Sequence, residues 1–105
     1  MNYGLKVSKI TLSVEKEVTE IDYRNTYTDV IVKLENGASF VATFFTYQYF
    51  LEQIQYHRQS GDFLSGKYFW TDLMILIEDC SAKNVEAVVE DMIDEGDFLL
   101  AFQRL

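Results

Sequence analysis

The chain has 105 residues, of which 49% are hydrophobic and 15% aromatic, and a formal net charge of −8 at pH 7. This length and composition exclude a disordered chain and predict a single compact domain over residues 1–105 with one hydrophobic core. The acidic balance disfavours nucleic acid and anionic membrane surfaces, so we expect neither as a partner.

The cysteine content and the N-terminus bear on the cellular compartment. Cys80 is the one cysteine, so the sequence contains no internal disulfide framework. The first seven residues lack the continuous apolar stretch of a secretory signal. The longest apolar run, residues 73–77, is too short to span a bilayer. We therefore expect a cytoplasmic protein.

The N-terminal part of the chain predicts three strands. Residues 5–14 alternate imperfectly between apolar and polar, and a bulge near Ser8 and Lys9 accounts for the change of phase. Residues 27–35 alternate regularly and predict a second strand. Residues 38–45 predict a third strand, with aromatic or aliphatic side chains on both faces.

A tight turn joins the second and third strands. Asn36 and Gly37 form the dipeptide that best occupies a two-residue type I′ turn, because both central residues of that turn need a positive φ. We therefore predict an antiparallel hairpin in which residues 28–35 pair with 38–45.

The second half of the chain predicts two helices around a further strand. Helical spacing follows Thr46, a suitable N-cap, and ends at Gly61. The continuous apolarity of residues 73–77 predicts a central strand covered on both faces. Ser81 then begins a second helix that ends at Gly96. Its apolar stripe is Val85, Val88, Val89, Met92 and Ile93.

The order of these elements predicts the fold class. The sequence reads β-β-β-α-β-α, and residues 98–102 form either a last short strand or a packed tail. We expect an α+β fold: an antiparallel or mixed sheet of four or five strands with two helices on one face.

The acidic charge is concentrated in residues 78–97, which hold eight carboxylates and one lysine. Glu86, Glu90 and Asp94 stand four residues apart on the second helix, where like charges repel. Asp94 also lies at the helix C-terminus, the unfavourable end of the dipole for an anion. With Asp97, these residues predict a surface for a basic protein. A solvated face and a divalent-cation site are the alternatives, although a helical row does not match calcium-loop spacing.

Aromatic residues form a second candidate site. Eleven of the sixteen aromatic side chains lie between residues 40 and 70. Tyrosine and tryptophan favour half-buried positions at interfaces and pocket mouths. Tyr47, Tyr56, Tyr68 and Trp70 are therefore predicted to line a groove between the first helix and the fourth strand; ordinary core packing is the alternative.

Cys80 and His57 are the one pair that suggests nucleophilic catalysis. Glu78 and Asp79 beside the cysteine disfavour the thiolate, and no surrounding motif matches a cysteine-nucleophile signature. A buried structural cysteine is the preferred interpretation. We therefore expect no enzymatic activity, no cofactor and no metal site.

These observations favour a small acidic protein-interaction module. One concrete form is an immunity- or inhibitor-like protein that neutralises a basic partner such as a nuclease. The alternative is a small-molecule binding or sensor domain that uses the aromatic groove.

Overall fold

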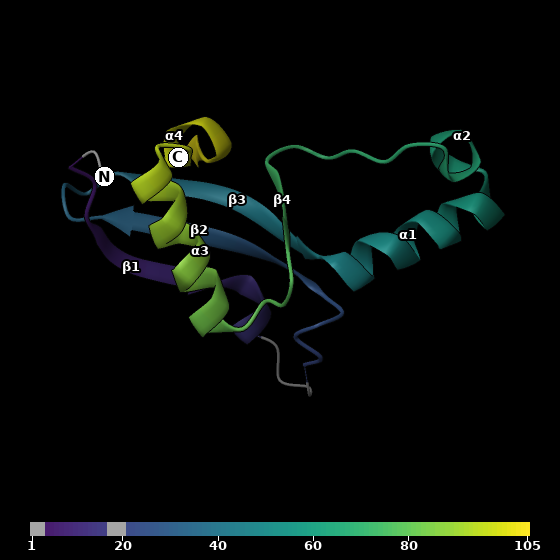
Figure 1. Cartoon of the computed structure of the whole chain (residues 1–105), viewed down its shortest axis with the longest axis horizontal. Coiled ribbons are helices and arrows are strands. Elements are labelled where there is room, and N and C mark those ends of the chain that lie inside the picture. The colour runs from purple at the N-terminus through teal and green to yellow at the C-terminus, as the bar shows by residue number, and fades with distance from the viewer. Residues whose placement is uncertain (1–3, 17–20) are drawn as a thin grey trace.

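The computed structural model describes residues 4–16 and 21–105 and has an α+β fold built on a mixed five-stranded sheet (Figure 1). Strands β1, β2 and β3 are antiparallel, β4 is parallel to β3, and β5 is antiparallel to β3. The predicted fold class is confirmed. The elements in chain order are β1 (Val7–Leu12), the 3-10 helix η1 (Ser13–Lys16), β2 (Tyr27–Leu34), β3 (Ser39–Thr46), α1 (Tyr47–Ser60), α2 (Asp62–Gly66), β4 (Met74–Ile77), α3 (Ala82–Glu95), α4 (Phe98–Ala101) and β5 (Gln103–Arg104).

The β2–β3 hairpin forms, but its turn and register differ from the prediction. Val32 pairs with Phe40, one residue away from the partner that a two-residue turn would give. Three residues, 35–37, form the loop; the Gly37 N–H donates to the Leu34 carbonyl oxygen (3.0 Å), and Gly37 alone among these three has a positive φ. The Asn36 side chain instead accepts a hydrogen bond from the Ala38 N–H (2.9 Å).

Burial explains why this register is adopted. It places Thr28, Val30 and Val32 beside Phe44, Ala42 and Phe40, and all six side chains are buried on one face. A shift by one residue would turn the apolar side of β3 away from that of β2. The bulge predicted in β1 is confirmed, because the pairing with β2 shifts between Val7 and Lys9.

Helices α3 and α4 cover this buried face (Figure 1). The prediction for α3 is confirmed: Val85, Val89 and Ile93 are buried, Val88 and Met92 are half-buried, and the carboxylates of the predicted row are exposed. The Ser81 side chain caps the helix by accepting from the Asn84 N–H, and Gly96 ends it in the left-handed conformation. The sequence allows either a short strand or a packed tail for residues 98–102. In the structure Phe98–Ala101 form the helix α4, and Phe102 leads into β5.

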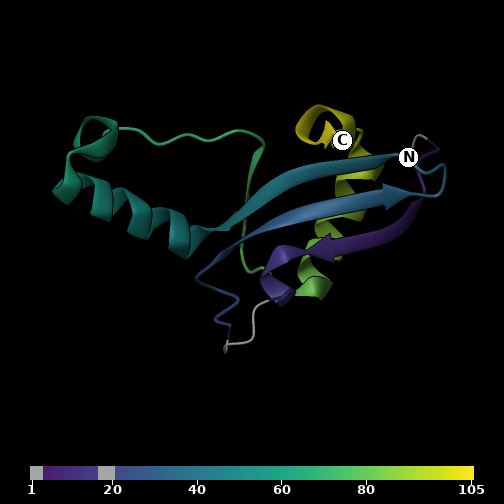
Figure 2. The ribbon, with the colours of Figure 1, turned by 180° about the vertical axis from the view of Figure 1, so that it is seen from behind.

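Helix α1 does not lie on the sheet as expected. Thr46 ends β3 and caps α1 in turn, so the helix continues beyond the end of the sheet (Figures 1 and 2). Residues 67–73 run back beside it to β4. We call residues 47–73 the arm. Within the described ranges no helix is long and apolar enough to cross a membrane.

Strand β4 is also placed differently from the prediction. It pairs with β3 and with no second strand in the described part of the chain, so it lies at an edge of the sheet. Of its four residues only Ile77 is buried, and Leu76 is 40% exposed. The prediction that the apolar run 73–77 forms a central strand covered on both faces is therefore wrong.

A strained turn closes the tip of the arm. Phe63, Leu64 and Ser65 all have φ between 53° and 58°, a conformation that costs roughly 1–2 kcal/mol for each non-glycine residue. Gly66 follows, buried against α1. A Cβ at Gly66 would lie 2.7 Å from Arg58 Cγ and 2.8 Å from the backbone oxygen of Ile54.

The packing of α3 predicts how single substitutions on its two faces affect stability. Val89→Ala should lower the free energy of unfolding by about 1–3 kcal/mol, because it removes buried methyl groups from the core. Glu90→Gln, the neighbouring exposed control, should change it by less than about 0.5 kcal/mol. Denaturant titration measures both, and the reverse ranking would contradict the assignment of the faces.

The tip of the arm predicts a contrast between two glycines. Gly61 and Gly66 both have a positive φ, but a Cβ at Gly61 meets no atom within 4 Å. Gly61→Ala should cost about 1 kcal/mol, whereas Gly66→Ala should cost roughly 2–4 kcal/mol, because it also forces α2 away from α1. Thermal unfolding followed by the fluorescence of Trp70, the single tryptophan, measures both; equal losses would refute the close packing.

Candidate functional site

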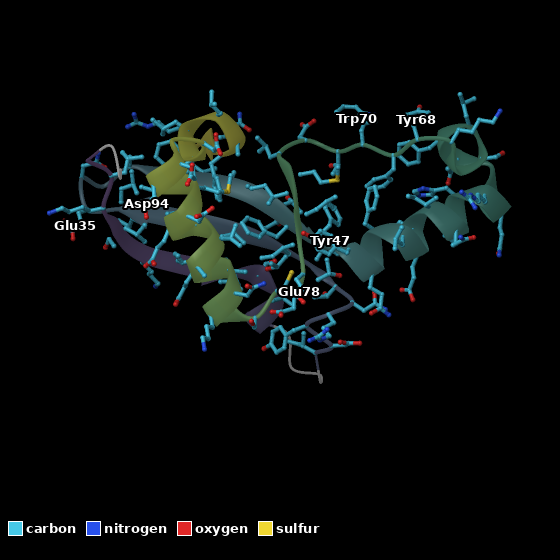
Figure 3. The ribbon with its side chains drawn as sticks, viewed as in Figure 1. Glu35, Tyr47, Tyr68, Trp70, Glu78 and Asp94 are labelled. Atoms are coloured by element: carbon cyan, nitrogen blue, oxygen red, sulfur yellow. The ribbon has the colours of Figure 1, made fainter. Side chains whose placement is uncertain are left out.

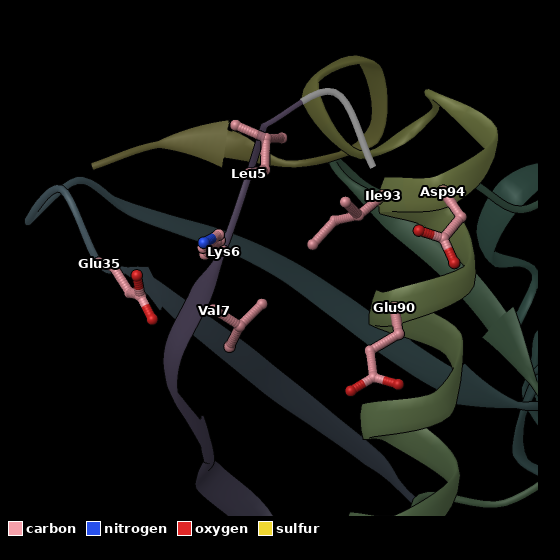
Figure 4. Close-up of a pocket in the computed structure, with 7 residues that line it drawn as sticks. All are labelled: Leu5, Lys6, Val7, Glu35, Glu90, Ile93 and Asp94. Carbon is pink, nitrogen blue, oxygen red and sulfur yellow. The ribbon is translucent and has the colours of Figure 1, made fainter. Parts of the chain in front are cut away.

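An open cavity of about 420 Å³ lies between α3, the start of β1 and the β2–β3 turn (Figure 4). Acidic and aliphatic side chains from these three segments form its wall. We call it the acidic groove. Its lining residues are Leu5, Lys6, Val7, Glu35, Glu90, Ile93 and Asp94.

Backbone pairing and helix packing position these side chains. The Glu35 N–H donates to the Lys6 carbonyl oxygen (2.8 Å), which ties the turn to the entry of β1. Glu90 and Asp94 lie one turn apart on α3, which is held against the sheet by Ile93 and the other buried residues of its stripe. Segments far apart in the sequence therefore contribute to one site.

The groove combines negative charge with an apolar wall. Three of its seven lining residues are carboxylates and one is a lysine. In Figure 4, Lys6 lies on the side of Glu35, and Glu90 and Asp94 face it from α3. Such an arrangement suits the side chain of arginine or lysine, whose methylene stem packs on apolar groups while its cation meets carboxylates.

Sequence reasoning identified part of this groove. Of the predicted acidic face, Glu90 and Asp94 line it, whereas Glu86 and Asp97 are exposed outside the lining. Glu35 and Lys6 were missed, because their position beside α3 follows from the pairing of β1 with β2. A single glutamate before a turn carries no sequence signal of such a role.

The four side chains predicted to line an aromatic groove are exposed, and other rings pack between α1 and residues 67–73. Rings occupy the space between α1 and residues 67–73. The ring centroids of Phe50 and Phe69 lie 5.6 Å apart. The ring centroid of His57 lies 4.6 Å from that of Phe63 and 5.4 Å from that of Phe69. Of the eleven aromatic residues between positions 40 and 70, Phe50, Phe63 and Phe69 therefore pack inside the arm, together with His57. Tyr47, Tyr56, Tyr68 and Trp70 are each more than half exposed. Figure 3 labels three of them: Tyr47 at the start of α1, and Tyr68 and Trp70 on the segment that leads to β4.

Cys80 and His57 are not brought together. Cys80 lies in the core, where it is fully buried and its thiol donates a long hydrogen bond to the Phe44 carbonyl oxygen (3.9 Å). Burial, reinforced by the nearby Asp79 carboxylate, raises the pKa of the Cys80 thiol to about 11. His57 is buried in the arm among aromatic rings, and its Nδ1 has no hydrogen-bond partner among the described residues.

Two negative findings bear on the site. In the described ranges, no group of three or more His, Cys, Asp and Glu side chains is arranged to hold a metal ion. Comparison of the chain with protein-family models, curated proteins and solved structures gives no significant match. Function therefore has to be argued from the surfaces themselves.

Burial of Cys80 predicts an unreactive thiol. At pH 8, iodoacetamide should alkylate the folded protein roughly 100-fold more slowly than the urea-unfolded protein, because the thiolate is the nucleophile. Stability should also fall as pH rises from about 9 to about 11, since the unfolded chain loses the thiol proton first. Cys80→Ala should lack this part of the pH dependence; equal alkylation rates would contradict the burial.

Proposed function

We propose that the chain is an acidic protein-interaction module that holds a cationic side chain of a basic partner in the acidic groove. The observation that carries the proposal is that Glu35, from the β2–β3 turn, and Glu90, from α3, line one groove together with aliphatic side chains. Charge on the open helix face alone would attract any cation, whereas a walled groove also selects for the length and stem of a side chain.

The wider charge distribution supports the same partner. Glu86 and Asp91 lie outside the groove on α3 and extend its negative field. A field of this kind speeds the encounter with a basic protein, and the groove supplies the specific contact. An immunity- or inhibitor-like role against a basic enzyme, such as a nuclease, fits these requirements.

The alternative is a small-molecule sensor that uses a groove between the first helix and the fourth strand. We favour the acidic groove over it, because ring contacts occupy the space between α1 and residues 67–73, which lead into that strand. The proposed module needs no catalytic group, in keeping with the separation of Cys80 from His57.

The groove is tested with a defined probe, N-acetyl-arginine methylamide, in an NMR titration. The amide signals of Lys6, Glu35, Glu90 and Ile93 should shift together, with a dissociation constant in the millimolar range expected for so small a ligand. The neutral citrulline analogue has the same shape without the cation and should cause no such shifts. Added salt should weaken the arginine probe.

Matched double substitutions separate the groove from the general field. Glu35→Lys with Glu90→Lys should weaken the probe by at least about tenfold. Glu86→Lys with Asp91→Lys makes the same change in net charge on exposed positions outside the groove and should weaken it much less. Equal weakening by the two pairs, or shifts spread evenly along α3, would reduce the acidic face to a solvated surface.

A further inference from the structure

No helix of the described part of the chain lies over the face of the sheet opposite α3 (Figure 2). Tyr27, Ile31 and Leu76 are exposed on it by 49%, 37% and 40%. Phe45 lies between Tyr27 and Leu76, because the two residues are its partners on β2 and β4. Phe45 itself is buried, because the rings of Tyr49 and Phe69 in the arm pack against it. The exposed Tyr27, Ile31 and Leu76 form an apolar surface with the half-buried Val41, and we call this surface the open face.

The arm also exposes apolar side chains, which are spread over α1, α2 and residues 67–73. Six large hydrophobic side chains on it are exposed, and this is unusual for a segment of its length in a monomer. The arm packs on itself through its inner rings and leaves these side chains without a cover. They are Tyr47, Leu51, Tyr56, Leu64, Tyr68 and Trp70.

Topology links the two surfaces. Strands β3 and β4 are parallel neighbours joined through a helix, and such a crossover helix ordinarily packs on a face of its own sheet. Here α1 leaves the end of the sheet instead. Only the first turn of α1 contacts the open side of the sheet, where Tyr49 packs on Tyr27 and Phe45. The rest of the open face lacks a covering helix.

The size of the exposed surface matches an interface. The chain exposes 6939 Å², about 800 Å² more than a compact monomer of 12.3 kDa would expose. Its radius of gyration is 14.9 Å, against about 13 Å for a compact domain of this length. The exposed surface is therefore large enough to include the area of about 800 Å² that each partner buries in a standard protein–protein interface.

Charge limits the side through which two copies of an acidic chain can meet. The carboxylate row of α3 lies over the other face of the sheet, so the open face is free of it. Lys9 and Lys33 are neighbours on the open face, which also carries Asp29, so its net charge is +1. The arm contributes Glu52, Asp62 and Asp72 against Arg58 and Lys67, a net charge of −1. An arm laid on an open face therefore brings weakly opposite charges together.

We propose that the chain forms a twofold-symmetric dimer in which the arm of each protomer covers the open face of the other. The 14 residues of α1 span about 21 Å, and the eight residues of β2 span about 26 Å, so the arm is long enough for the task. This inference does not depend on the acidic groove, which opens on the side of α3.

Sedimentation equilibrium tests the dimer with one substitution on each surface. The wild-type chain should sediment at twice 12.3 kDa. Ile31→Lys on the open face and Leu51→Lys on the arm should each raise the dimer dissociation constant by roughly 30-fold or more. Leu100→Lys makes the same change on α4, at an 86% exposed position away from both surfaces, and should have no effect.

Mixing the two variants tests the reciprocal arrangement. In a dimer of either variant alone, both contacts between an arm and an open face contain a lysine. In a mixed dimer of Ile31→Lys and Leu51→Lys, both lysines fall in one contact and the other contact is intact. Because a contact broken by one lysine loses little more from a second, the mixture should associate more tightly than either variant alone. A wild-type monomer at millimolar concentration overturns the proposal. So does a dimer that resists both substitutions, a dimer sensitive only to Ile31→Lys, or a mixture that shows no recovery. Circular dichroism checks that each variant is folded.

Discussion

The pairing of β2 with β3 is the constraint on which the remaining structure depends. With Val32 beside Phe40, the side chains of both strands that form the hydrophobic core point to one face, and α3 packs there. The same register sends Ile31 and Phe45 to the other face. The sheet therefore has one face buried under helices and one open face. The acidic groove lies on the side of α3, and the open face lies on the opposite side.

The two surfaces lie on opposite sides and use different physics. The acidic groove joins α3 to the turn of the hairpin, and the binding that we propose for it depends on charge around a small apolar wall. The open face and the arm depend on burial of aromatic and aliphatic area. Because the row on α3 repels a second acidic copy, self-association and binding of a basic partner need not compete for the same side.

The arm is held by contacts at both of its ends. Near the sheet, Tyr49 stacks on Phe45 at 5.9 Å and approaches Tyr27 at 5.3 Å. At the tip, Phe63 reaches the ring of His57 from a left-handed turn. Residues kept in a strained conformation persist only where their surroundings hold them, so these ring contacts and the fit of Gly66 on α1 offset the cost of the turn.

Local pattern was sufficient for much of this protein. Thr46, Gly61, Ser81 and Gly96 delimit the two long helices where capping rules place them, because a cap depends on atoms within one turn. The buried stripe of α3 follows from helical spacing, and so does the exposed row that contains Glu90. The fold class follows from the order of the elements.

Tertiary structure decided what lies between those elements. The hairpin register depended on matching the apolar sides of β2 and β3, which overrode the turn preference of Asn36-Gly37. The positions of α1 and β4 depended on where β3 ends and on packing within the arm, so an apolar run was found at an edge of the sheet. The place of Glu35 beside Glu90 arose from long-range pairing. Sequence spacing encodes contacts made within a turn or a strand, whereas contacts between distant segments exist only once the chain has folded.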